Sequence, residues 1–121
     1  KKITENRWEA YIDNGREPTG KDVIEWAKEV EKLGAGEIML TSIDKEGTKK
    51  GFDIELNQAV SAAVSIPIIS SGGMKSSNDA INLLKASKID AIATASTLHY
   101  NLESIQEIKQ NLINNDIKVR V

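Results

Sequence analysis

The alternation of two hydrophobic patterns constrains the fold of this chain most. Short apolar runs, typical of buried parallel strands, lie at residues 37–42, 66–70 and 89–95. Apolar residues recur at the three- and four-residue spacing of amphipathic helices at 20–33, 53–64, 76–85 and 102–114. Strands that alternate with helices of this length predict a parallel sheet with right-handed crossovers.

The first 19 residues carry a different pattern. Trp8 and Tyr11 are followed by Asn14-Gly15, a dipeptide that favours a tight hairpin turn. We therefore expect an extended arm and hairpin over residues 1–19, with both aromatic side chains in the core or at an interface. Because 121 residues suffice for one domain and no more, the arm and the alternating region are expected to form a single unit, 1–121.

Two architectures fit this order of elements: an open doubly wound sheet, or part of a closed (β/α)8 barrel. A bare three-stranded parallel sheet leaves two open edges, and a complete barrel needs eight strands and typically ~250 residues. The length therefore indicates a fragment, an unusual oligomer or a small flavodoxin-like domain. The first residue is Lys rather than Met, which processing, cloning or truncation would each explain.

Composition excludes several classes of function. The net charge of −2 gives no electrostatic reason to expect nucleic acid or a membrane as a partner. The chain has no cysteine, and His99 alone cannot build a histidine-rich metal site, so no cofactor is expected. The start of the chain is polar and no apolar run approaches the ~20 residues that span a bilayer, so we expect a cytoplasmic protein.

Small and polar residues collect where the expected strands end. In parallel α/β folds these carboxyl ends form the ligand-binding face. Ser71-Gly72-Gly73 and Ala95-Ser96 stand there, and backbone N–H groups from two such neighbouring loops commonly hold one phosphate. The pattern alone is equally compatible with Gly72-Gly73 forming only a tight turn.

Charged residues near the strand ends also allow two interpretations. Asp44 and Glu46 are a possible general acid and base, or part of a solvated loop beside lysines. Glu37 opens an apolar strand, so it lies either inside a barrel, where it needs a cationic partner, or exposed at the rim. His99 is expected at the surface or in packing rather than in catalysis.

Residues 34–44, followed by Gly47-Thr48, are similar to the sixth-strand motif of the cyclase subunits of imidazole glycerol phosphate synthase, the HisF family. The segments 15–27, 66–73 and 90–99 resemble, in order, the stretch before that motif and the seventh and eighth strands. The resemblance covers essentially the whole chain. It implies an α/β fold that is the C-terminal half of a (β/α)8 TIM barrel, from the arm through helix 5 to strand 8 and helix 8.

The family's cyclase receives ammonia from a partner glutaminase subunit, which is HisH-like. It closes an imidazole ring on a substrate with a phosphate at each end, in histidine biosynthesis. The resemblance implies that one substrate phosphate is held by Gly47, Gly73, Ala95 and Ser96. It further implies that Thr41 and Ser71 face this phosphorylated small-molecule substrate and that Glu37 belongs to a charged gate where ammonia enters.

The chain departs from the family pattern in two ways. The two catalytic aspartates of the family lie at the ends of the first and fifth strands, which this chain does not contain. It therefore holds no catalytic residue and is expected to be inactive alone. Glu46 stands where the motif has Asp, and the extra methylene moves a substrate-site carboxylate by ~1.5 Å, enough to disturb a tuned loop.

Two further functions remain open: a HisF-like paralogue that passes ammonia to a surface-sugar substrate, and a non-catalytic phosphate-binding half-barrel module. A half-barrel exposes two strand edges and an apolar lining formed by Met39, Ile69, Ala91 and Ala93. We therefore expect association with an N-terminal half-barrel or self-association. We also expect residues 1–14 to be poorly ordered or borrowed by a neighbour.

Overall fold

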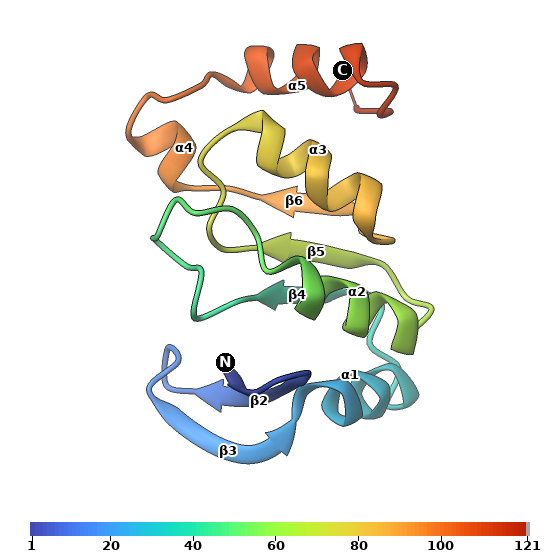
Figure 1. Cartoon of the computed structure of the whole chain (residues 1–121). Coiled ribbons are helices and arrows are strands. Elements are labelled where there is room, and N and C mark those ends of the chain that lie inside the picture. Colours follow the sequence, from blue (N-terminus) through green and yellow to red (C-terminus); the bar gives the residue numbers. More distant parts are fainter. Residues whose placement is uncertain (121) are drawn as a thin grey trace.

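The computed structural model describes residues 1–120, which form two separate three-stranded sheets (Figure 1). The N-terminal sheet is antiparallel, in the order β1 (Lys2–Thr4), β2 (Arg7–Ile12), β3 (Glu17–Asp22). The second sheet is parallel, in the order β4 (Ile38–Thr41), β5 (Ile68–Ser71), β6 (Ala91–Ala93). The predicted parallel sheet with helical crossovers is confirmed.

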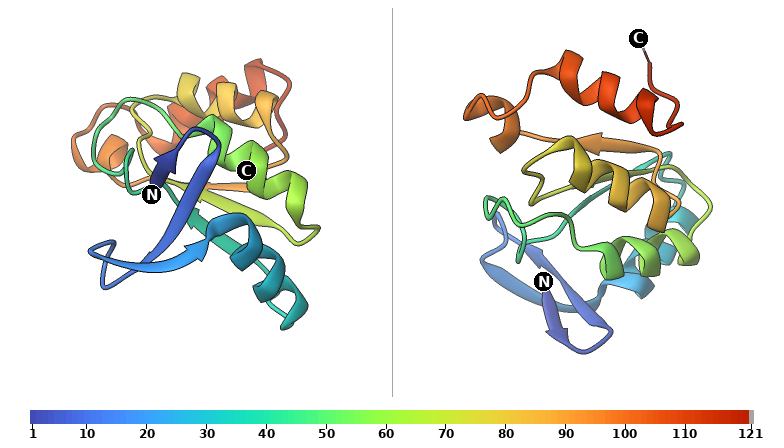
Figure 2. Two further views of the ribbon diagram at one scale, coloured as in Figure 1. Left: turned by 60° about the horizontal axis from the view of Figure 1, so that its bottom comes forward. Right: turned by 45° about the horizontal axis from the view of Figure 1, so that its top comes forward.

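Five helices accompany the sheets: α1 (Val23–Lys32), α2 (Ile54–Ala63), α3 (Ser77–Ala86), α4 (Ser96–His99) and α5 (Ile105–Asn114). The helices α2 and α3 lie across one face of the parallel sheet, α1 packs beside α2, and α5 packs on α3 (Figures 1 and 2). The hydrophobic core fills the space between this helical layer and the sheet, and includes Leu56, Val60, Ile68 and Leu83.

The register of the parallel sheet separates its two faces. Met39, Ile69 and Ala91 are Cα partners in neighbouring strands, so their side chains share one face. Leu40 and Ser70, one position further along, point to the opposite face and are buried under the helices. The helices therefore cover one face only, and Met39 on the other face is 62% exposed.

Side-chain caps explain where the helices begin. Asp22 accepts hydrogen bonds from the N–H groups of Ile24 and Glu25 at the start of α1. Capping boxes start α3, at Ser76 with Asp79, and α5, at Ser104 with Glu107. Each cap satisfies N–H groups that a helix leaves without partners in its first turn.

Three expectations about element boundaries are wrong. The first long helix begins at Val23 rather than at residue 20, because Glu17–Asp22 pairs with β2 as a strand. The short helix α4 occupies Ser96–His99, where a loop was expected. The last helix begins at Ile105 rather than at residue 102, because the capping box at Ser104 fixes its first turn.

The expectation that residues 1–14 are poorly ordered or borrowed by a neighbour is also wrong. The strands β1 and β2 pair with each other, and the predicted hairpin turn at Asn14-Gly15 joins β2 to β3. Trp8 is 4% exposed, and its Nε1–H donates to the Asp53 carboxylate at 3.4 Å. The N-terminal sheet is therefore packed onto the rest of its own chain through the buried side chain of Trp8.

Each helix within residues 1–120 is too short or too polar to cross a membrane.

Candidate functional site

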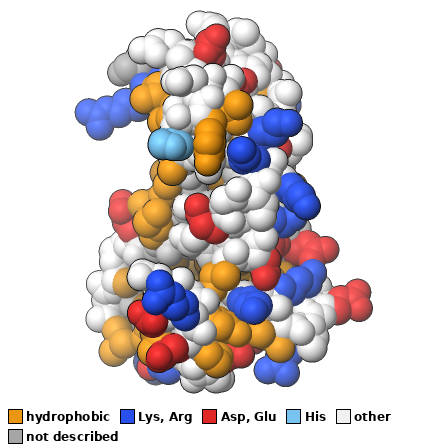
Figure 3. Space-filling view, turned by 90° about the vertical axis from the view of Figure 1, so that its left-hand side faces the viewer, with side chains coloured by type: hydrophobic (Ala, Val, Ile, Leu, Met, Phe, Trp, Pro, Cys, Tyr) orange, Lys and Arg blue, Asp and Glu red, His pale blue; other side chains and the backbone are white. Residues whose placement is uncertain are grey.

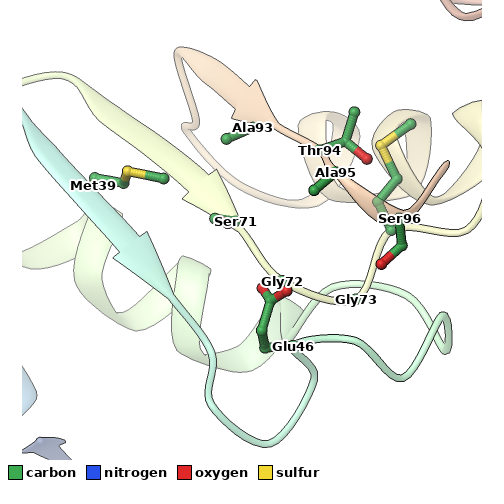
Figure 4. A pocket seen from close by; sticks show the side chains of 10 residues that line it. Met39, Glu46, Ser71, Gly72, Gly73, Ala93, Thr94, Ala95 and Ser96 are labelled. Carbon is green, nitrogen blue, oxygen red and sulfur yellow. The ribbon is translucent and has the colours of Figure 1, made fainter. Parts of the chain in front are cut away.

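A hollow of about 180 Å³ opens where β5 and β6 end (Figure 4). The turn after β5 forms one wall, and the loop that leads from β6 into α4 forms another. The loop after β4 contributes the side chain of Glu46 to the edge of the hollow. The lining residues are Met39, Glu46, Ser71, Gly72, Gly73, Met74, Ala93, Thr94, Ala95 and Ser96.

The turn after β5 requires its two glycines. Gly72 and Gly73 have φ angles of +99° and +97°, in the region that side chains disfavour. A Cβ on Gly73 would overlap the Gly51 carbonyl oxygen and lie 2.9 Å from the Lys45 Cβ. The Gly51 N–H donates to the Gly73 carbonyl at 2.8 Å, so the loop after β4 packs directly on this turn. No larger residue fits at position 73 without moving that loop.

Backbone donors are free at the hollow. Within residues 1–120, the N–H groups of Gly73 and Ser96 have no hydrogen-bond acceptor, although Gly73 is buried. Because an unpaired backbone N–H in a protected position has a strong tendency to find an acceptor, the two groups suit a small anion with several oxygen atoms. The arrangement can therefore hold a phosphate group.

Glu46 adds a negative charge to the edge of the hollow. A Cβ placed on Gly72 would lie 3.3 Å from the Glu46 Oε2, so this carboxylate sits against the glycine turn, as Figure 4 shows. It would repel an anion placed close to it and would accept hydrogen bonds from hydroxyl or amino groups. The hollow thus offers donors on one side and an acceptor on the other.

The structure brings together most of the residues that the sequence singled out for substrate binding. Five of them line the same hollow: Glu46, Ser71, Gly73, Ala95 and Ser96. Gly47, next to Glu46, is exposed and is not part of the lining. Thr41 lines instead a larger groove of about 730 Å³ along the outer edge of β4. Figure 3 shows the face on which the strands end, where apolar side chains gather between charged ones.

Three other predicted residues lie outside the hollow. Glu37 is exposed just before β4, at the opposite end of the sheet, and forms no salt bridge among residues 1–120. Asp44 accepts a hydrogen bond from the Lys2 N–H at 2.7 Å, so it anchors the N-terminal sheet. His99 is exposed and makes an edge-to-face contact with Tyr100, with ring centroids 4.9 Å apart.

Two buried polar residues that were not predicted as site residues support the loops around the hollow. Asp53 is 9% exposed and caps α2 by accepting the Leu56 N–H at 3.0 Å. An Asp just before a helical pattern is a cap signal and was available in the sequence. Thr97 is fully buried; it belongs to the polar residues that follow the strand predicted at 89–95, but its partner, the Met74 carbonyl, lies 23 residues away and no local pattern predicts it. The described residues contain no cluster of His, Asp and Glu able to hold a metal ion.

Comparison with known proteins identifies the family. The model of the histidine biosynthesis protein family matches residues 2–104. The imidazole glycerol phosphate synthase subunit HisF of Lactococcus lactis subsp. cremoris strain SK11 is 51% identical over 114 residues, which cover 94% of this chain and 44% of that relative. The HisF subunit of strain MG1363 is 49% identical over the same shares.

The chain therefore belongs to the histidine biosynthesis protein family, a family of TIM-barrel proteins, as the resemblance indicated. It spans 44% of the length of the curated relatives that it matches.

Proposed function

We propose that the chain is the C-terminal half-barrel of a HisF-type cyclase of imidazole glycerol phosphate synthase, and that it contributes one substrate phosphate site. The observation that carries the proposal is the hollow that Gly73 and Ser96 line from two neighbouring loops, with backbone N–H groups that have no acceptor within residues 1–120. Two adjacent loops after the last strands of a barrel are a recurrent phosphate site. The names of the two relatives supply the pathway, histidine biosynthesis.

In this proposal the residues of the hollow divide the binding of the substrate. The N–H groups of Gly73 and Ser96 hold phosphate oxygens, and Ala95 leaves room for them because its side chain is small. Ser71 and Glu46 face the part of the substrate next to the phosphate and bind its hydroxyl groups. Thr41, at the end of the neighbouring strand β4, extends the substrate-facing surface.

Ring closure itself belongs to the complete barrel, because this chain holds neither of the family's catalytic aspartates. The complete protein would take ammonia from a glutaminase subunit and act in the cytoplasm. Glu37 stands at the end of the sheet opposite to the hollow, which is where an ammonia gate would lie. The departure from Asp at Glu46 would then change how the substrate is held rather than which reaction occurs.

The free edges of the parallel sheet support the half-barrel. A groove of about 730 Å³ follows the outer edge of β4, and one of about 850 Å³ follows the outer edge of β6. Both grooves have apolar walls, and open strand edges pair readily with other strands. The proposed partner is an N-terminal half-barrel, which would have to add the five strands that an eight-stranded barrel needs besides β4, β5 and β6. A second copy of this chain is the alternative.

The phosphate site is tested by titrating the ¹⁵N-labelled chain with inorganic phosphate and following the amide resonances. We expect saturable shifts centred on Gly73 and Ser96, and loss of binding in Gly73→Val. Gly34→Val is the matched control, because Gly34 also has a φ of +97° but faces open space away from the hollow. Unchanged phosphate affinity in Gly73→Val would remove this site from the proposal.

A further inference from the structure

Two hydroxyl groups and a carbonyl form a continuous chain beneath the hollow. The Thr94 Oγ1 donates to the Thr97 Oγ1 at 3.1 Å, and the Thr97 Oγ1 donates to the Met74 carbonyl at 3.0 Å. Thr97 is 0% exposed, so water does not compete for these bonds. We infer that Thr97 is a positioning residue that sets the distance between the two loops of the anion hollow, an inference that rests on the proposed phosphate site.

These hydrogen bonds involve residues that are adjacent in the sequence to the two proposed phosphate donors. Met74 directly follows Gly73, and Thr97 directly follows Ser96, the two residues whose N–H groups are free. Consecutive Cα atoms are ~3.8 Å apart, so a bond between positions 74 and 97 fixes positions 73 and 96 closely. The buried Thr97 hydroxyl therefore links the N–H groups of Gly73 and Ser96, although no strand pairing joins the loops after β5 and β6.

The turn after β5 is held from both sides. The Gly51 N–H holds the Gly73 carbonyl at 2.8 Å, and the Thr97 hydroxyl holds the next carbonyl, that of Met74. Rotation of either peptide group would break its bond. Rotation would also turn a carbonyl oxygen, which carries partial negative charge, toward a neighbouring anion. The two bonds thus keep the turn in the orientation that favours an anion.

A separate group of hydrogen bonds, which does not involve Thr97, holds the helices α3 and α5 together. The Glu103 carboxylate accepts from the Ser77 N–H at 2.5 Å and from the Ser77 Oγ at 2.9 Å, and Asn111 donates to the same Oγ at 2.7 Å. These bonds fasten the start of α3 to α5 and to the segment just before it. Loss of the Thr97 hydroxyl should therefore loosen the hollow without unfolding the chain.

The test compares variants at position 97 by titration of the chain with inorganic phosphate. Thr97→Val removes the hydroxyl and keeps the shape of the side chain, and we expect phosphate affinity to fall roughly tenfold, as for loss of a buried hydrogen bond. Thr97→Ser keeps the hydroxyl and should retain affinity within about twofold of the original. Ser87→Ala is the matched control, because its Oγ also donates to a carbonyl, that of Leu83 at 2.7 Å, away from the hollow.

Equal phosphate affinity in Thr97→Val and the original chain would overturn the inference, as would an equal loss in Ser87→Ala. If Thr97→Val does not fold, Thr97→Ala takes its place and the same outcomes decide. Gly73→Val separates the two proposals. If it abolishes binding while Thr97→Val does not, the site stands and the role of Thr97 falls; if it leaves binding intact, the site itself is wrong and the inference falls with it.

Discussion

The two faces of the parallel sheet differ sharply although their strands are apolar on both sides. On the face under α2 and α3, Leu40, Ile68 and Ser70 are 9%, 1% and 0% exposed. On the other face no layer of the described chain covers Met39, and Ala91 is exposed as well. Parallel sheets are normally buried on both faces, so the open face lacks a layer that the strand sequences anticipate.

The covered face and the open face of the parallel sheet therefore have different roles. The covered face supplies the apolar burial that stabilises the chain, since burial contributes about 25 cal/mol for each Å² removed from water. The open face contributes little to the stability of the chain alone, but it carries the apolar lining that a barrel partner would bury. Substitutions on the two faces should consequently affect different measurements.

The largest expected effect comes from truncating a side chain on the covered face. Ile68→Ala should lower the free energy of unfolding by about 3 kcal/mol, because it leaves a cavity at a position that is 1% exposed. Met39→Ala, on the open face, should change it by less than about 0.5 kcal/mol. Urea unfolding of both variants at one low protein concentration measures the difference. Similar losses in both would mean that the open face is already covered.

An intermediate effect is expected on association. Met39→Glu places a charge on the open face, on the edge strand β4, where an associated partner would have to bury it. We expect the dissociation constant of the self-associated chain, or of its complex with an N-terminal half-barrel, to rise at least about tenfold, which corresponds to ~1.4 kcal/mol. Sedimentation velocity over a concentration series gives this constant.

Glu25→Gln is a suitable control for the association experiment, because Glu25 lies on an exposed part of α1, away from the open face. A chain that remains a compact monomer at high micromolar concentration, with cooperative unfolding, would contradict the half-barrel. It would favour an independently folded small α/β domain.

The sequence predicted the repeating elements because their signals are local. Four helices and three parallel strands follow from apolar periodicity, and Asn14-Gly15 marks the hairpin turn where β2 joins β3. The helix α4 was missed because four residues, Ser96–His99, are too few to show a period. The start of α5 was available from Ser104 and Glu107, whose three-residue spacing is that of a capping box.

Long-range contacts account for what the sequence did not reveal. The order of residues 1–14 depends on Trp8 meeting Asp53, which is 45 residues away, so no local pattern predicts it. The link between Thr97 and Met74 is equally invisible in the sequence. At the candidate site, the positions of the strand ends and of the glycines predicted which loops form the hollow. That Gly47 and Thr41 do not line it could be seen only in the structure.

The smallest expected effect concerns a carboxylate that fastens α1 to the segment leading from α2 into β5. Glu31 of α1 accepts hydrogen bonds from the Ser65 Oγ at 2.6 Å, the Ser65 N–H at 2.7 Å and the Ile66 N–H at 3.1 Å, just before β5. These bonds, led by those from Ser65, hold the pKa of Glu31 below its usual 4.5. A carboxyl group with a lowered pKa in the folded chain stabilises it above that usual value, and the contribution is lost as the pH falls through the lowered one.

Glu31→Gln should therefore be slightly less stable than the original chain at pH 7, and the difference should shrink as the pH falls through the lowered pKa of Glu31. Glu37→Gln is the matched control, because Glu37 is exposed before β4 and its carboxylate forms no salt bridge within residues 1–120. Urea midpoints of the three proteins at pH 7, 5 and 3 test this. The effect will be modest because Glu31 lies near solvent, where water competes for its bonds. A difference between Glu31→Gln and the original chain that persists unchanged at pH 3 would show that the charge of Glu31 does not hold α1 to the sheet.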